Sequence, residues 1–253
     1  MTKAFVLHSG GLDSTTALFL ARKEHGSENV LSVSVDYNQR HRKEIDQANK
    51  ICELFGIGRA VLKIEDMPIS MLTDASASVP NVSYADLPEG VSPTYVPFRN
   101  GQLLSKVAAL ASMHDGPSVI YFGAHAEDAE RDAYPDCTLH FVGAMAAAIY
   151  IGTYHKVRIN APFLSMSKAG IVTLGTDLEV PFELTWSCYK GQDLHCGTCP
   201  TCRSRKNAFL IADIKDPTDY DSEIDQSITN TAFGKPSGLV EPPRKDPFDD
   251  IPF

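Results

Sequence analysis

The first 64 residues alternate between short apolar runs and segments in which apolar side chains recur at helical spacing. Short apolar runs predict buried strands, and the helical spacing predicts amphipathic helices between them. The strands are expected at 4–7, 29–35 and 59–64, and the helices at 14–23 and 42–55. This strand–helix alternation is typical of an α/β fold with a parallel, doubly wound sheet.

The alternation returns after residue 98, with strands expected at 118–123 and 157–160 and helices at 100–113, 136–154, 168–178 and 203–211. Residues 66–98, between the two parts, are rich in Ser, Pro, Asp and Gly, and a loop of that length in a compact domain is typical of a lid. The sequence therefore predicts an α/β nucleotide-binding domain at 1–182 with a lid insertion at 66–98, a zinc-binding helical module at 183–212, and a flexible, acidic, Pro-rich tail at 213–253.

Charge and hydropathy narrow the class of protein. The formal net charge is −9, and residues 214–253, with nine acidic and four basic side chains, contribute −5 of it. Nonspecific binding to nucleic acid uses a positive surface, so we expect no stable nucleic-acid binding. No apolar run reaches the roughly 18 residues needed to span a bilayer, and the first residues lack the apolar region of a signal peptide. We expect a cytoplasmic protein.

A glycine-rich loop follows the first strand. Gly10 and Gly11 allow a close backbone approach to an anion, and N–H groups at the following helix terminus favour phosphate there. The Walker lysine and the Gly-x-Gly-x-x-Gly spacing are both missing. The alternative is a plain turn in which Asp13 or Ser14 caps a helix. A nucleotide site would comprise Leu7, His8, Ser9, Gly10, Gly11, Leu12, Asp13, Ser14 and Thr15, with Asp36 and Arg40 at the end of the second strand.

Four of the six cysteines lie within fifteen residues, at Cys188, Cys196, Cys199 and Cys202. Four thiolates at such short spacings suit tetrahedral Zn²⁺, and a fully protein-ligated site is structural. An iron–sulfur cluster and unligated thiols are the alternatives. His195 is expected to be a neighbour of the site rather than a ligand.

The motif Ser-Gly-Gly-Leu-Asp-Ser at 9–14 resembles the loop of the PP-loop ATP pyrophosphatases, which implies an adenine nucleotide alpha hydrolase-like fold. Further segments resemble the 7-cyano-7-deazaguanine synthase (QueC) family of that group: Tyr-Asn-Gln-Arg-His at 37–41, Val-Pro-Phe-Arg-Asn at 96–100, Tyr-Pro-Asp-Cys-Thr at 134–138 and Trp-Ser-Cys-Tyr at 186–189. The resemblance also implies zinc on the four clustered cysteines. Asn38 and Phe98 replace family glycines, and Thr138 replaces an arginine.

The resemblance implies an ATP-dependent carbon–nitrogen ligase of queuosine-type 7-deazaguanine biosynthesis. Such an enzyme converts 7-carboxy-7-deazaguanine and ammonia to 7-cyano-7-deazaguanine through an adenylate and an amide, with Mg²⁺ on the phosphates and release of AMP and pyrophosphate. Because the three replacements lie in segments expected to face the substrate, alternatives stay open. In the first alternative, the enzyme stops at 7-amido-7-deazaguanine for DNA modification. In the second, it acts on another acid. A tRNA-thiolating enzyme and a nucleotide sensor without turnover are further alternatives.

Specific roles also follow from the resemblance. The residues expected to serve catalysis are Ser9, Asp13, Ser14, Arg99 and Lys168, and those expected to bind the deazaguanine acid are Arg99, Asn100, Tyr134 and Asp136. Other interpretations are a helix cap for Asn100 and Asp136, and surface positions for Arg99 and Lys168. We expect His41, His125 and His140 to be structural histidines with satisfied hydrogen bonds.

Two expectations concern partners. Members of the family suggest a homodimer. The last residues, Asp249–Phe253, resemble the acidic tip of bacterial single-stranded DNA-binding proteins, which docks in an apolar pocket ringed by basic residues. A solvated tail is the alternative to docking with a partner protein.

Overall fold

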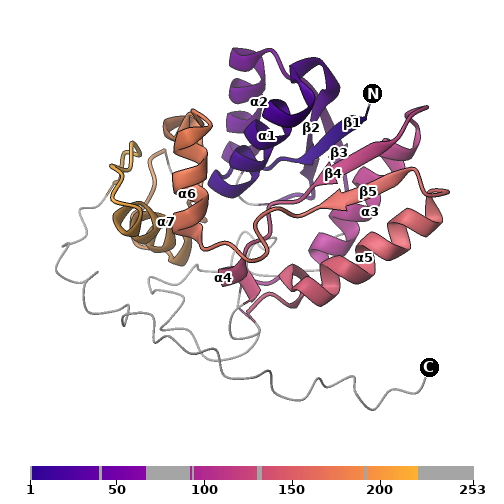
Figure 1. The fold of residues 1–253 in the computed structure, drawn as a ribbon. Helices are drawn as coiled ribbons and strands as arrows, with labels where there is room; N and C mark the ends of the chain where they lie inside the picture. Colours follow the sequence, from indigo (N-terminus) through magenta and orange to yellow (C-terminus); the bar gives the residue numbers. More distant parts are fainter. Residues whose placement is uncertain are drawn as a thin grey trace. The chain divides into compact units, whose positions relative to one another are not determined.

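The computed structural model describes residues 2–39, 42–66, 92, 94–129, 133–190 and 193–221, and Met1–Glu223 form one compact unit. Within the described residues the sheet has five parallel strands in the order β3-β2-β1-β4-β5 (Figure 1). The strands are β1 (Lys3–Leu7), β2 (Val30–Asp36), β3 (Gly58–Lys63), β4 (Ser118–Tyr121) and β5 (Val157–Asn160). The strand order reverses direction beside β1, so the doubly wound fold expected from the sequence is confirmed.

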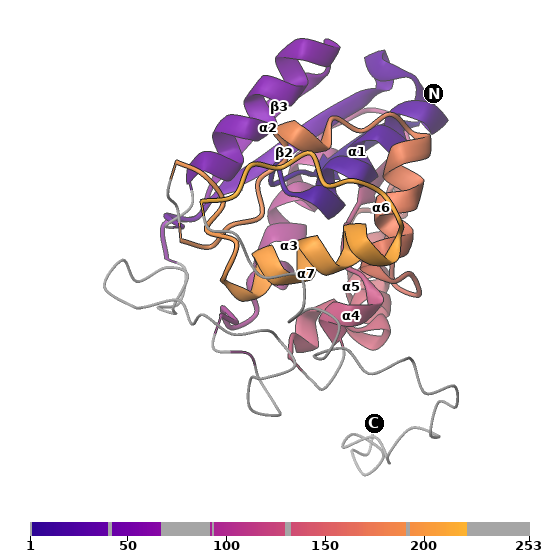
Figure 2. The ribbon, with the colours of Figure 1, turned by 90° about the vertical axis from the view of Figure 1, so that its left-hand side faces the viewer.

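Helices cover both faces of the sheet (Figure 2). One core cluster joins β1 to α1 (Leu12–His25), α2 (Arg42–Phe55), α6 (Lys168–Asp177) and α7 (Pro200–Ile211). The second joins the sheet to α3 (Arg99–Ser112) and α5 (Leu139–Gly152). The described residues also form four short elements: α4 (Ala126–Ala129), η1 (Ser27–Asn29), η4 (Pro135–Cys137) and η5 (Phe182–Leu184). No helix in the described part is both long and apolar enough to cross a membrane.

Four helix starts differ from the sequence prediction, and α1 and α3 begin two residues and one residue earlier than expected. Helix α5 begins at Leu139 because Thr138 is its N-cap, with Thr138 Oγ1 accepting the N–H of Phe141 at 3.2 Å. The expected first turn, at 136, is a separate 3₁₀ turn. Helix α7 begins three residues earlier than expected, because Cys199 is its N-cap and Pro200 its first residue.

Parts of three predicted features lie outside the described residues. These are Arg40, most of the 66–98 lid (67–91 and 93), and the tail from 222 onward with its Asp249–Phe253 tip. His41 lies outside as well. The predicted boundaries of the domain, module and tail stay predictions.

Candidate functional site

The glycine-rich loop lies where the order of the strands reverses. Strand β1 pairs with β2 on one side and β4 on the other, so the loop after β1 opens between two diverging connections. Open α/β sheets bind ligands at this point, outside the carboxyl ends of the strands. The segments that follow β2, β4 and β5 converge on the same edge, and they supply the remaining side chains of the site.

Gly10 has no room for a side chain. Its φ is 91°, and a Cβ built on it would lie 2.2 Å from Glu44 O and 2.9 Å from Ala48 N, both backbone atoms of α2. Its carbonyl accepts the N–H of Trp186 at 2.9 Å. Glycine is therefore required by both the backbone angle and the packing.

Two serine hydroxyls close the loop on itself. Ser9 Oγ and Ser14 Oγ lie 3.0 Å apart, Gly11 N–H donates to Ser9 Oγ at 3.2 Å, and Ser14 Oγ donates to Gly11 O at 3.2 Å. Gly11 occupies the N-cap of α1, and no side chain caps that helix. The interpretation of a turn capped by Asp13 or Ser14 is therefore wrong, and the N-terminal N–H groups of α1 stay available to an anion.

Residues flanking the loop face the interior. His8 is fully buried, with Nδ1 2.8 Å from Ser32 Oγ and Nε2 3.1 Å from Thr15 Oγ1. Burial, assisted by the charge of Arg59, lowers the pKa of His8 to about 3, so the ring is neutral. Leu12 and Thr15 are also buried. The side chains of these residues support the loop, whereas a nucleotide would contact their backbone.

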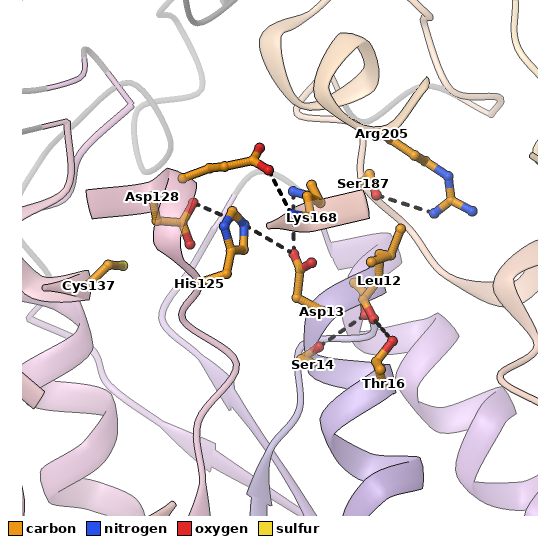
Figure 3. Close-up of polar contacts among 12 residues, drawn as sticks. Leu12, Asp13, Ser14, Thr16, His125, Asp128, Cys137, Lys168, Ser187 and Arg205 are labelled. Carbon is orange, nitrogen blue, oxygen red and sulfur yellow. Dashed lines mark hydrogen bonds and ion pairs between the residues drawn. The ribbon is translucent and has the colours of Figure 1, made fainter. Parts of the chain in front are cut away.

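A charged cluster lies beside the loop, at the ends of β4 and β5 (Figure 3). Lys168 Nζ is 3.4 Å from Asp13 Oδ2, and the Lys168 side chain is only 12% exposed. Burial alone would lower the pKa of Lys168, but the carboxylates of Asp13, Asp128 and Glu127 raise it. Lys168 is therefore a charged residue of the site and not an ordinary surface lysine.

His125 belongs to the same cluster. It is 3% exposed, and its Nε2 lies 3.4 Å from Asp128 Oδ1 and 3.9 Å from Asp13 Oδ2 (Figure 3). Among the described residues, neither His125 Nδ1 nor Asp13 Oδ1 has a hydrogen-bond partner, although both atoms are buried. The expectation that His125 is a satisfied structural histidine is wrong. Its position four residues after an apolar strand is the signal that could have revealed it.

A second cluster lies at the start of α3. Arg99 Nη1 donates to Tyr37 Oη at 3.4 Å, and Arg99 Nε is buried with no hydrogen-bond partner in the described structure. Asp136 Oδ2 accepts the N–H of Asn100 at 2.9 Å, and Asn100 Nδ2 donates to Asp136 O at 3.2 Å. Asp136 thus holds the first turn of α3, and the alternative interpretation, in which it caps α5, is wrong because Thr138 is that cap. Tyr134 is also buried, and its hydroxyl contacts those of Ser92 and Thr94.

The end of β2 carries Asp36, one of the expected nucleotide-binding residues. Asp36 Oδ1 accepts the N–H of Asn38 at 3.0 Å, and its Oδ2 lies 3.5 Å from Arg42 Nη2. Asn38 has a φ of 61°, which explains why the family has glycine there. Asp36 therefore shapes the turn after β2, next to the loop.

Because of Glu44, in the first turn of α2, we expect the free energy of unfolding to depend on pH. Burial raises its pKa from 4.5 to about 7, against the opposing charge of Arg99. Between these values the folded chain holds a proton that the unfolded chain has lost, so the free energy of unfolding falls as pH rises through that window. We expect Glu44→Gln to remove this fall, as measured by urea denaturation at about pH 5 and pH 8. Glu53→Gln, on an exposed position of α2, is the control and should behave like the wild type.

The four clustered cysteines are arranged so that they could hold a metal ion. The four Sγ atoms lie within 4.8 Å of one another and all four residues are buried. Backbone N–H groups of Cys196, Thr198 and Cys199 point at sulfur atoms at 3.3–3.4 Å, as expected around thiolates that bind a metal. Gly197, with a φ of 69°, makes the turn between ligands. The donor set fits tetrahedral Zn²⁺.

This cluster is connected to the glycine-rich loop through Trp186. Its backbone N–H donates to Gly10 O, and its Nε1 donates to Cys188 O at 2.9 Å. His195 stacks on the Trp186 ring with centroids 4.2 Å apart, and its Nε2 accepts the N–H of Ser187 at 2.9 Å. The expectation that His195 is a neighbour of the cysteines agrees with these contacts.

Arg205 secures the same segment from α7. Its side chain is fully buried, donates to Thr185 Oγ1 at 2.6 Å and to Phe182 O at 3.0 Å, and pairs with Asp216 at 3.2 Å. A buried arginine without such partners would be costly. No sequence motif indicated this residue, because its partners come from two separate segments, one at 182–187 and the other at Asp216.

Comparisons with known proteins show what this chain is similar to. The family described as "Queuosine biosynthesis protein QueC" matches residues 3–213. A 7-cyano-7-deazaguanine synthase from Caldicellulosiruptor bescii is 41% identical over 88% of this chain and 99% of its own length. One from Thermoplasma volcanium is 42% identical over 86% of this chain and 90% of its own. Among solved structures, the U34-tRNA thiolase NcsA from Methanococcus maripaludis aligns over 91% of this chain and 78% of its own, at 15% identity and a TM-score of 0.46.

Proposed function

The chain belongs to the QueC family, and on that premise we propose that it is an ATP-dependent ligase that makes 7-cyano-7-deazaguanine from 7-carboxy-7-deazaguanine and ammonia. The observation that carries the proposal is the pairing of two sites at one sheet edge. One is the glycine-rich loop at the start of α1 with a lysine that is only 12% exposed beside it, and the other is an arginine with a buried N–H that has no partner in the described structure. The first suits the phosphates of ATP, and the second suits the carboxylate of the acid.

The loop and Lys168 would hold the ATP phosphates. In our proposal the Gly10–Gly11 backbone and the Ser9 and Ser14 hydroxyls receive the departing pyrophosphate, and Lys168 neutralises its charge. Asp13 keeps Lys168 in place, with Nζ 3.4 Å from Oδ2. Mg²⁺, bound with the nucleotide, would supply further charge neutralisation on the phosphates. Asp13 Oδ1, which is buried and has no hydrogen-bond partner among the described residues, fits a cation or its water at this place.

Arg99 would bind the acid directly. Its Nε is buried and has no partner in the described structure, so a substrate carboxylate would satisfy it. Asn100, Tyr134 and Asp136 already have protein partners for the atoms described above. We propose that Asn100 and Asp136 serve the substrate mainly by fixing the start of α3, and that Tyr134 does so by holding Ser92 and Thr94. A planar guanidinium held in this way gives a directional carboxylate site.

The proposed chemistry has two activations. A carboxylate oxygen attacks the α-phosphorus of ATP, pyrophosphate leaves, and ammonia then displaces AMP from the acyl carbon to give the amide and a proton. The amide oxygen attacks the α-phosphorus of a second ATP, and a second pyrophosphate leaves. Loss of AMP and of the two remaining N–H protons then gives the nitrile. No side-chain nucleophile takes part. The residues supply positioning and charge stabilisation.

A direct assay tests this proposal. The purified protein with ATP, Mg²⁺, ammonia and the carboxy-deazaguanine should release AMP, and mass spectrometry should find the nitrile. An amide as the final product, one water heavier than the nitrile, would favour the amide-forming variant. Absence of AMP would reject the ligase function altogether.

We also propose that the protein forms a homodimer through α5. This helix contains no Lys, Arg, Asp or Glu, and its Leu139 and Ile151 are 69% and 70% exposed. The small residues between them on the same face are exposed as well: Gly143, Ala144, Ala147 and Ala148. A continuous apolar stripe of this kind is typical of an interface, and small side chains let two copies of a helix approach closely around a twofold axis.

Ala147→Glu should therefore convert the dimer to a monomer, because it places two like charges in the apolar helix pair. Light scattering coupled to size-exclusion chromatography measures the mass directly. Ala109→Glu, on an exposed position of α3, is the matched control and should remain dimeric. A monomeric wild type, or a dimeric Ala147→Glu variant, would contradict this interface.

A further inference from the structure

Phe98 adopts a backbone conformation that a bulky residue rarely takes. It is the N-cap of α3 with a φ of 54° and a ψ of 25°, in the left-handed region, and its side chain is 52% exposed. A large aromatic ring gains little by remaining in water, and a Cβ makes this backbone conformation unfavourable. Such strained positions persist where surrounding contacts enforce them, and they concentrate at functional sites.

The surrounding contacts do fix the ring. Phe98 N–H donates to Tyr95 Oη at 2.9 Å, and Phe98 O accepts the N–H of Gln102 at 3.2 Å. The ring lies against Gly101, where a built Cβ would come within 2.4 Å of a ring carbon. It also meets Phe141 edge to face, with centroids 5.8 Å apart. One part of the ring is thus packed while the rest stays open.

The open ring directly precedes the anion-binding residue. Arg99 follows in sequence, and its buried Nε has no hydrogen-bond partner among the described residues. Asn100, which holds Asp136, fixes the same helical turn. An exposed aromatic ring and an unsatisfied guanidinium N–H on consecutive residues suit one ligand that is both flat and anionic. An aliphatic acid would leave the ring uncovered, and a neutral heterocycle would leave the guanidinium unpaired.

We propose that Phe98 is a specificity-determining residue, whose exposed ring stacks on the planar heterocycle of an aromatic carboxylic acid held by Arg99. The inference rests on the proposed function, because it names how that site selects a deazaguanine acid. It also accounts for the strained backbone: the left-handed N-cap sets the direction of the ring at the residue before Arg99, whereas a residue in the helical conformation would direct its side chain back along α3.

Phe98→Gly tests the stacking, because glycine adopts the left-handed conformation freely and removes only the ring. The KM for the carboxy-deazaguanine should rise by about tenfold, since stacking of a base on one aromatic ring contributes roughly that factor in affinity. The KM for ATP and the kcat should stay within about twofold, and Phe98→Tyr should restore the wild-type KM.

Tyr154→Gly is the matched control. Tyr154 is also an aromatic residue in the left-handed region, with a φ of 53° and 90% exposure, but it lies before β5 at the opposite edge of the sheet. It should change neither KM. An unchanged or lower KM for the acid in Phe98→Gly, or an equal rise for ATP, would overturn the stacking role. Absence of AMP release by the wild-type protein would instead reject the proposed function.

Discussion

Gly10→Ala is expected to reduce ATP-dependent turnover by at least about a hundredfold, because the loss of even one preorganised donor at a charged site costs that much. The new Cβ would lie 2.2 Å from Glu44 O and 2.9 Å from Ala48 N. Both are backbone atoms inside α2, so they cannot rotate away as a flexible side chain could. The φ of 91° adds strain for any residue other than glycine. The loop must therefore move, and its N–H groups and serines leave the phosphate position.

Steady-state AMP release and nucleotide binding by calorimetry measure this effect. Gly58→Ala is the matched control, because a Cβ there would meet Leu31 Cδ1 at 3.4 Å, an ordinary contact, and Gly58 lies in β3 away from the loop. The control should retain both activity and affinity. Gly10→Ala protein that remains folded and keeps turnover within tenfold of the wild type would show that the loop does not bind the phosphates.

Local sequence patterns could predict much of this fold. The short apolar runs and the helical spacings predicted the type and order of the main elements, because the buried face of a helix or strand carries apolar residues at the period of that element. Helix starts were less accurate. Thr138 replaces Asp136 as the cap of α5, since Asp136 is drawn into a long-range bond with Asn100 N–H. No local pattern records that contact.

The candidate site divides in the same way. The glycine-rich loop and the four cysteines are contiguous motifs, so both could be recognised from their spacing in the sequence. His125, Glu44 and Arg205 act through partners on other elements, and only the folded chain brings these together. Phe98 is intermediate: the replacement of a family glycine was visible, but its exposed ring and positive φ were not.

Cys199→Ser is expected to eliminate the bound metal and, with it, most of the affinity for ATP. Cys199 is fully buried and is also the N-cap of α7, so loss of a thiolate there affects both the metal site and the helix start. Binding of structural zinc contributes about 10–16 kcal/mol to the folding of small zinc-binding peptides. We therefore expect the Cys199→Ser variant to have a lower free energy of unfolding than the wild type. Elemental analysis should find about one zinc per wild-type chain and almost none in the variant. Iron would instead indicate a cluster.

The loss of ATP affinity follows from Trp186, which joins the two sites. Its Nε1–H donates to Cys188 O and its backbone N–H donates to Gly10 O. If loss of the metal disorders the cysteine cluster, Trp186 moves and the glycine-rich loop loses this hydrogen bond. Chelation of the wild-type metal should weaken ATP binding equally, and Zn²⁺ should restore it. Cys52→Ser, at a buried thiol of α2 outside the cluster, should keep its metal and its ATP affinity. Metal-free protein that binds ATP normally would contradict the coupling, and the cysteine cluster would then stabilise only its own segment.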